Sequence, residues 1–194
     1  MTDPDAEKAA LRAELRARRV RLKAERPDAA IKAALAFEAA GLGSFATAAI
    51  YHPHGSEMDP YPLAVVLERW GARIALPAAV ARDQPLVFRL QSEEGPLPPD
   101  AIGMPAPPPE APAVRPDLVI APLLGFDARG GRIGQGGGFY DRTLAALRAE
   151  GSLMVVGLAY AGQELPAVPM GPFDQRLDGV LTDEGFRPAD TETR

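Results

Sequence analysis

The chain has 194 residues, a formal net charge of -5, a pI near 5.1 and no cysteine. Its length suits one domain with a sizeable core, the acidic balance argues against general nucleic-acid binding, and the lack of cysteine excludes disulfides and thiolate catalysis. No apolar run approaches the roughly 20 residues needed to span a bilayer. We therefore expect one domain over residues 1–194, cytoplasmic and monomeric, without nucleic-acid or membrane partners.

Two helices are predicted at the start of the chain. About residues 5 to 25 are rich in helix formers with leucines on one stripe, and a second helix is predicted from Asp28 to the residue before Gly41. In the first helix, Lys8, Arg12 and Arg16 recur every four residues, so that one face carries a column of cations. From spacing alone, a solvated helix surface is the favoured interpretation.

After the second helix, the sequence predicts a strand, a third helix and two further strands. Asp59 is expected to cap this helix, which has Pro60 in its first turn and continues through Trp70. The strands before and after it are predicted at 47–51, 73–76 and 86–90.

Two groups of polar residues follow the first strand. His52 and His54 flank a proline, but without a third histidine or any cysteine they are interpreted as loop residues rather than metal ligands. Glu57 follows at the carboxyl edge, where parallel sheets place ligands. Its position fits a ligand contact and a simple turn residue equally well.

A proline-rich segment with nine prolines extends from Pro96 to Pro116. Prolines prevent regular ladder hydrogen bonding, so we expect an extended loop that wraps the domain. Beyond it, a helix is predicted at 139–150, with strands at 117–121, 153–158 and 179–181. This alternating order predicts an α/β fold with three layers and a mostly parallel central sheet.

The glycine-rich segment between the strand at 117–121 and the helix at 139–150 is the strongest functional signal. It reads G-F-D-A-R-G-G-R-I-G-Q-G-G-G-F-Y-D-R from Gly125 to Arg142 and contains seven glycines. Glycines adopt positive φ and can turn backbone N–H groups toward an anion, and the following helix adds its own free N–H groups. We interpret the segment as a phosphate site, although neither the dinucleotide fingerprint nor the P-loop pattern fits it.

Two charged residues of this segment have a chemical rationale. Arg132 offers a planar fork of donors to a phosphate. Asp141 lies in the first helical turn, where a carboxylate interacts favourably with the helix dipole and a simple cap would explain it. A carboxylate beside polyphosphate is also explained by Mg²⁺ bound between them.

The pattern D-L-V-I-A-P-L-L-G-F-D-x-x-G-x-R-I-G-x-G-G-G-F-Y-D-R-T-L resembles the signature of the 5-formyltetrahydrofolate cyclo-ligase family. Further family features occur in the right order. They are K-x-x-x-R (Lys8, Arg12), G-S-E-M-D-P (55–60), I-G-M-P (102–105), G-L-A-Y (157–160) and F-D-x-x-L-D-G-V-L-T (173–182). The chain departs from the family in three respects: family members often have a basic residue at the position of Gly137, a large one at Gln135 and Glu at Ala106.

The resemblance implies roles for individual residues. Arg132 and Asp141 are the expected catalytic residues, and Asp141 and Asp174 the expected Mg²⁺ ligands, with Asp127 as second choice. Arg16, Arg18, Arg19 and Arg21 are expected to be ordinary surface charges. The expected ATP contacts are Lys8, Arg12, Arg132, Ile133, Gly134, Gln135, Gly136, Gly137, Gly138, Phe139 and Tyr140. The expected folate contacts are His52, Glu57, Gln135, Gly136, Gly137, Gly138 and Phe139.

The resemblance implies an ATP- and Mg²⁺-dependent enzyme that cyclises 5-formyltetrahydrofolate to 5,10-methenyltetrahydrofolate and releases ADP and phosphate. Two rival functions remain open from the residues alone. One is a sugar-phosphate isomerase or CoA-transferase-like enzyme, whose glycine loop binds a substrate phosphate without spending ATP. The other is a noncatalytic nucleotide-binding protein.

Overall fold

A seven-stranded sheet forms the centre of the molecule in the computed structural model, which describes residues 4–91 and 97–190. The strand order is β3-β2-β1-β4-β7-β8-β9. The five inner strands are parallel, whereas the edge strands β3 and β9 are antiparallel to their neighbours. The bounds are β1 (Thr47–Ala49), β2 (Arg73–Ala79), β3 (Leu86–Leu90), β4 (Leu118–Pro122), β7 (Met154–Leu158), β8 (Gly179–Thr182) and β9 (Gly185–Pro188).

The inner strands are apolar on both faces because helices cover both. In β4, the residues from Leu118 to Ala121 are fully buried, and Val119 is in register with Ala49 of β1 and Val155 of β7. Continuous apolar runs of this kind are typical of parallel strands, which have no solvent-facing side. These contacts hold the carboxyl ends of β1, β4 and β7 along one edge.

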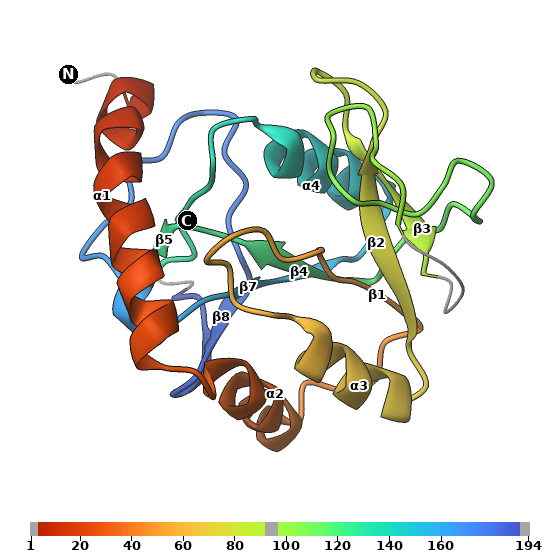
Figure 1. Ribbon diagram of the computed structural model, residues 1–194, viewed down its shortest axis with the longest axis horizontal. Coiled ribbons are helices and arrows are strands. Elements are labelled where there is room, and N and C mark those ends of the chain that lie inside the picture. Colours follow the sequence, from red (N-terminus) through yellow and green to blue (C-terminus); the bar gives the residue numbers. More distant parts are fainter. Residues whose placement is uncertain (1–3, 92–96, 191–194) are drawn as a thin grey trace.

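The helices form the outer layers (Figure 1). α2 (Ala29–Ala40) and α3 (Tyr61–Arg69) cover one face, and α4 (Phe139–Glu150) packs on the other. α1 (Pro4–Glu25) stands at the end of the sheet, where its buried Leu15 belongs to a smaller core cluster with residues near the glycine segment. The predicted three-layer α/β fold is therefore confirmed.

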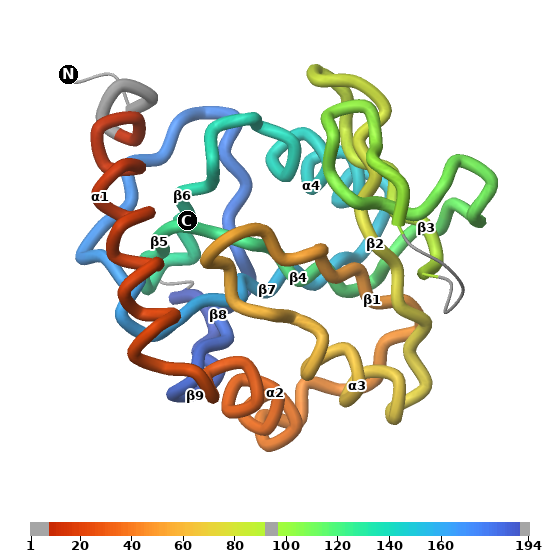
Figure 2. Tube along the Cα trace, viewed as in Figure 1, coloured from red at the N-terminus to blue at the C-terminus, as the bar shows by residue number. Residues whose placement is uncertain are grey.

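Three local predictions need correction. β1 ends at Ala49 rather than at residue 51, so the last residues of the expected strand leave the sheet toward its carboxyl edge. Pro60, not Asp59, is the N-cap of α3, although Asp59 Oδ1 accepts a hydrogen bond from the Tyr61 N–H at 2.9 Å. β9 was not predicted; it forms a hairpin with β8 and lies beside α2 (Figure 2).

The glycine-rich segment contains a hairpin before its last four glycines. β5 (Gly125–Phe126) and β6 (Arg132–Ile133) pair antiparallel, and the chain then continues into α4. The proline-rich segment, over residues 97–116, is extended as predicted and contacts β3 through irregular hydrogen bonds such as Val114 N to Phe88 O. A short 3₁₀ helix, η1 (Ala161–Gln163), follows β7. None of the helices in the described part of the chain is long and apolar enough to cross a membrane.

Candidate active site

A cavity of about 790 Å³ lies at the carboxyl ends of β1 and β4. Most of its wall comes from one face of α1, the turn after β1, the turn at residues 100–105, and the glycine loop that leads into α4; the loop with Asp174 also contributes. Its lining includes Lys8, Arg12, Arg16, Arg19, Tyr51, His52, Glu57, Met104, Arg132, the glycine loop from Gly134 to Gly138, Phe139, Tyr140, Asp141 and Asp174. Almost all residues predicted for the two ligands thus surround one space; of them, only Ile133 is buried in the core beneath the loop.

The glycine loop requires glycine at two positions. Gly136 has φ 99° and Gly138, the N-cap of α4, has φ 65°, which are left-handed conformations that favour glycine. Helix α1 holds the loop from outside, because Arg12 Nε donates to the Gly134 carbonyl at 3.1 Å and Arg16 Nε donates to Gln135 Oε1 at 2.9 Å. The free N–H groups at the start of α4 and these guanidinium groups make this end of the cavity suitable for an anion.

Arg132 lies beside the loop and is 6% exposed. Its Nη2 donates to Asp141 Oδ1 at 2.7 Å, and its guanidinium lies over the Tyr140 ring at 5.8 Å. Its Nε is buried without a hydrogen-bond partner among the described residues. A buried donor without a partner is costly, which is consistent with a site that accepts an anionic ligand.

Two carboxylates, Asp141 and Asp174, line the cavity at the same end as the glycine loop and Arg132. Asp141 Oδ1 also accepts from the Gln175 N–H at 3.0 Å, which ties α4 to the loop that carries Asp174. Asp174 pairs with Lys8, whose side chain is almost fully buried, and accepts from the Gly171 N–H at 2.6 Å. Among the described residues, Asp141 thus accepts hydrogen bonds from Arg132 and from Gln175, which lie outside α4.

The opposite wall carries Glu57. Its Oε2 accepts a hydrogen bond from the His54 N–H at 2.9 Å, and its Oε1 lies 3.5 Å from Arg19 Nη1. Close by, the Tyr51 hydroxyl donates to the Met58 carbonyl, and burial raises the pKa of Tyr51 well above its ordinary value. His52 is held by Tyr61, with Nδ1 3.2 Å from the hydroxyl oxygen.

Tyr140 lies between the two ends of the cavity. Burial raises the pKa of its hydroxyl, and the nearby Glu57 carboxylate adds to this effect. The phenol therefore stays neutral at physiological pH and can act as a hydrogen-bond donor.

Three expectations about charged residues are corrected. Arg16 is more than a surface charge, because it lines the cavity and its Nε donates to Gln135 Oε1 at 2.9 Å. Arg19 is not a surface charge, because it is 4% exposed and lines the cavity. Asp127 does not line it; the N–H groups of Arg129, Gly131 and Val168 donate to its oxygens, so it stabilises the hairpin. Arg142, at the end of the glycine-rich segment, does not line the cavity and donates to the carbonyls of Gly137 and Arg82.

Several lining residues were not identified from the sequence. The turn at 100–105 contributes Ile102 and Met104, and Asp100 fixes it by accepting three backbone N–H bonds. Arg19 could have been found, because it follows Arg16 by three residues and therefore lies on the same helix face as the cation column. For Tyr51 and the 100–105 turn no local pattern indicated the cavity.

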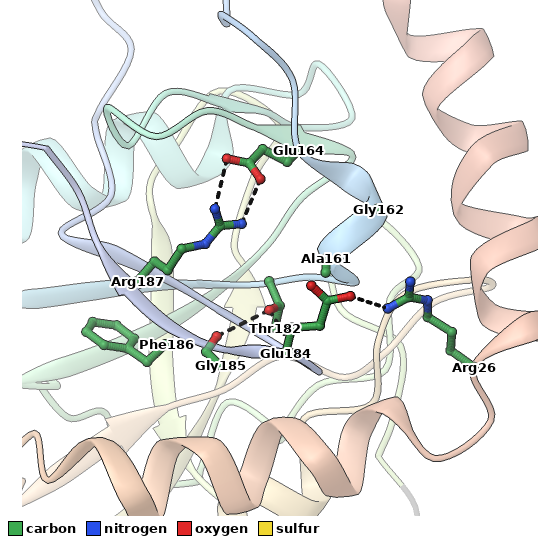
Figure 3. A pocket seen from close by; sticks show the side chains of 9 residues that line it. All are labelled: Arg26, Ala161, Gly162, Glu164, Thr182, Glu184, Gly185, Phe186 and Arg187. Atoms are coloured by element: carbon green, nitrogen blue, oxygen red, sulfur yellow. Dashed lines mark hydrogen bonds and ion pairs between the residues drawn. The ribbon is translucent and has the colours of Figure 1, made fainter.

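A second hollow of about 500 Å³ lies between η1 and the β8–β9 hairpin (Figure 3). Its charged side chains are paired with one another: Arg187 with Glu164 at 2.7 Å, and Arg26 with Glu184 at 3.1 Å. These pairs connect β9 to the end of η1 and α1 to the hairpin turn. We assign this hollow a structural role.

Comparisons with known proteins agree on one family. The model of the 5-formyltetrahydrofolate cyclo-ligase family matches residues 4–183. The 5-formyltetrahydrofolate cyclo-ligase of Mycolicibacterium smegmatis is 34% identical over 145 residues, which cover 70% of this chain and 73% of that protein. The protein of the same name from Escherichia coli K12 is 32% identical over 141 residues, which cover 70% and 77%.

Two solved structures share the fold, and both are 5,10-methenyltetrahydrofolate synthetases. That of Mycoplasma pneumoniae has a TM-score of 0.69 at 24% identity and covers 91% of this chain and 98% of its own. That of Aquifex aeolicus has a TM-score of 0.74 at 24% identity and covers 96% and 94%.

Proposed function

This chain belongs to the 5-formyltetrahydrofolate cyclo-ligase family, and we propose that the cavity at the carboxyl edge of its sheet carries out the reaction of that family. In this reaction, 5-formyltetrahydrofolate and ATP give 5,10-methenyltetrahydrofolate, ADP and phosphate. The chain works as one catalytic unit, since α1 supplies part of the cavity wall.

One observation carries the proposal: a single cavity has two chemically different ends. One end has the glycine loop with Lys8, Arg12 and Arg132, which suits a polyphosphate. The other end has Glu57 and Tyr51, and apolar residues such as Met104 also line the cavity, which together suit a flat heterocycle with polar edges. A volume of about 790 Å³ has room for a nucleotide phosphate chain next to a second ligand.

Mg²⁺ is the metal that fits the polyphosphate end. Asp141 and Asp174 are hard oxygen donors, both line the cavity, and the Gln175 N–H bond holds their segments together. No group of three or more histidine, aspartate, glutamate or cysteine side chains suited to a metal occurs in the described part of the chain. Two carboxylates are typical of Mg²⁺, which keeps several waters and binds substrate phosphates. When bound, the ion would neutralise charge on the transferred phosphoryl group.

Two cations at the polyphosphate end of the cavity are held in ion pairs with carboxylates. Lys8 is paired with Asp174, and Arg132 with Asp141. Each buried cation therefore has a counter-ion, which limits the cost of burial. On binding MgATP, we propose that the carboxylates turn to the metal while the cations contact phosphate oxygens.

The chemistry requires mainly positioning. The formyl oxygen attacks the γ-phosphorus, ADP leaves, and the formyl carbon becomes an electrophile with a phosphate leaving group. N10 then adds to this carbon, phosphate departs, and N10 loses its proton as the ring closes. Lys8, Arg12 and Arg132 stabilise the charge on the transferred phosphoryl group, and no covalent enzyme intermediate is needed.

The direct test is to mix the purified protein with MgATP and 5-formyltetrahydrofolate and to follow methenyltetrahydrofolate by its near-ultraviolet absorbance. We expect product formation with stoichiometric release of ADP. An isomerase or transferase that uses no ATP would release no ADP on addition of the folate. A noncatalytic protein would bind ATP with an affinity that does not change with folate.

Lys8→Met is expected to raise the KM for ATP at least about tenfold, because a buried charge-assisted contact is lost. The KM for folate should stay within about twofold, since Lys8 lies at the polyphosphate end. Steady-state kinetics with each substrate varied measure both values. Lys32→Met, at an exposed pair on α2, is the matched control. An unchanged ATP KM in Lys8→Met would contradict the assignment.

Gly136→Ala is expected to raise the KM for ATP at least about fivefold, because of backbone strain of about 1–3 kcal/mol in the phosphate loop. Its φ of 99° is unfavourable for alanine, and the new Cβ would lie 3.2 Å from Arg12 Cζ. Gly41→Ala provides the control, since Gly41 also has positive φ but has open space around it at the end of α2. If both variants lose stability but keep the wild-type ATP KM, the loop does not bind the nucleotide.

A further inference from the structure

Arg19 is a buried arginine that connects three parts of the folate end. Its Nε donates to Ser56 Oγ at 3.0 Å, and its Nη1 donates to the Leu123 carbonyl at 3.0 Å. Nη1 also lies 3.5 Å from Glu57 Oε1, in an ion pair whose side chains are only 5% and 10% exposed. Arg19 thereby joins α1 to the turn after β1 and to the end of β4.

Because the Arg19 guanidinium is buried, its positive charge must be stabilised by neighbouring groups. Desolvation lowers the pKa of Arg19, and the Glu57 carboxylate opposes this effect. Gln163 Nε2 donates to the same Leu123 carbonyl at 3.0 Å, so the carbonyl is fixed from a second side. These contacts hold the guanidinium plane in one orientation, which a flexible lysine would not reproduce.

Arg19, which lines the cavity, has hydrogen-bonding capacity left. Its Nη2 makes no hydrogen bond to the described residues and is not a buried atom, and the residue lines the cavity. Each Glu57 oxygen accepts one bond from the protein and has a further lone pair. The wall therefore offers a donor and an acceptor next to each other.

We propose that Arg19 is a further recognition residue of the folate site, which recognises the 4-oxo group of the pterin ring beside Glu57, the folate contact already expected from the family resemblance. Glu57 accepts from the ring N3–H and the 2-amino group, and Arg19 donates to the 4-oxo oxygen while it positions Glu57. This inference rests on the proposed function, since it names the polar contacts of the same folate site. Arg19 is then a specificity-determining residue, because a 4-amino ring presents a donor where Arg19 needs an acceptor.

The test compares wild type, Arg19→Gln, Arg19→Lys, Glu57→Gln and the double variant Arg19→Gln/Glu57→Gln. Tetrahydrofolate and its 4-amino analogue are used as competitive inhibitors of turnover. We expect Arg19→Gln to raise the folate KM at least about tenfold with the ATP KM within about twofold, and to reduce the preference for the 4-oxo inhibitor at least about fivefold. In the double variant, the factor by which the folate KM rises should be smaller than the product of the factors for the two single variants, since the two residues act together.

Arg18→Gln is the control, because Arg18 neighbours Arg19 on α1 but pairs with Glu14 outside the cavity. Arg19→Lys keeps the positive charge but lacks the planar guanidinium group. Its folate KM and its preference for the 4-oxo inhibitor should therefore lie between those of wild type and Arg19→Gln. Should Arg19→Gln fail to fold, a wild-type inhibitor preference in Arg19→Lys would overturn the proposal. The proposal would also be overturned if Arg19→Gln raised the KM for folate and the KM for ATP equally. The same holds if the rise in folate KM in the double variant equalled the product of the two single rises. Failure of the proposed function is distinct: the wild type would then neither turn over folate nor bind tetrahydrofolate in a fluorescence titration.

Discussion

Asp141→Asn should lower kcat at least about a hundredfold and raise the Mg²⁺ concentration required for half-maximal activity, because a neutral amide is a weaker ligand for a hard dication. The amide of the new side chain would still offer an oxygen to Arg132 Nη2 and to the Gln175 N–H, the two donors that Asp141 has now. We therefore expect the free energy of unfolding to fall by only about 1–2 kcal/mol.

Turnover measured across a Mg²⁺ titration, together with thermal unfolding, checks this prediction. Asp174→Asn should act in the same direction, since both carboxylates are assigned to one ion. Asp178→Asn is a suitable control, because Asp178 is an exposed partner of Arg148 outside the cavity. Wild-type activity with unchanged Mg²⁺ dependence in Asp141→Asn would remove this carboxylate from the metal site.

Arg132→Lys is expected to lower kcat at least about a hundredfold, an effect comparable to removing one donor from a preorganised anion site. Lysine keeps the positive charge, but it cannot pair with Asp141, lie flat over Tyr140 and donate to a phosphate from one planar group. The loss should appear in kcat more than in the ATP KM if Arg132 stabilises charge that develops during transfer.

The control for this variant is Arg129→Lys, on the same hairpin. Arg129 pairs with Asp127, and its side chain is 55% exposed, so the change should leave kcat within about twofold. Pre-steady-state measurement of ADP formation distinguishes slow phosphoryl transfer from slow product release. If Arg132→Lys forms ADP at the wild-type rate, Arg132 does not stabilise the transfer step.

The order and type of most elements could be predicted from the sequence, because they depend on local periodicity and turn chemistry. The apolar run at 117–121 indicated a buried strand, and four glycines before residue 139 marked the start of α4. In contrast, β9 is half exposed, and its one strand partner among the described residues is β8. Its four residues are too few to show a clear hydrophobic period.

The polyphosphate end was also largely predictable, since its residues come from one contiguous segment and one helix face. Lys8 and Arg12 were assigned through the family resemblance, and the structure places both in the cavity. Their spacing did not indicate that Lys8 is buried. Its charge is paired with Asp174, which lies far along the chain. A charge pattern on a helix does not reveal which partner will pack against it.

Sequence alone predicted the α/β order of the elements, the glycine loop before α4 and the family, because these depend on residues close together in the chain. Only the tertiary structure decided which charges are buried and line the cavity. Arg18 and Arg19 are neighbours of the same type, yet the first is a solvated partner of Glu14 and the second is buried against Ser56, Glu57 and Leu123. The difference arises from long-range packing of α1 against the ends of β1 and β4, because burial of a charge depends on the surrounding segments rather than on its neighbours in sequence.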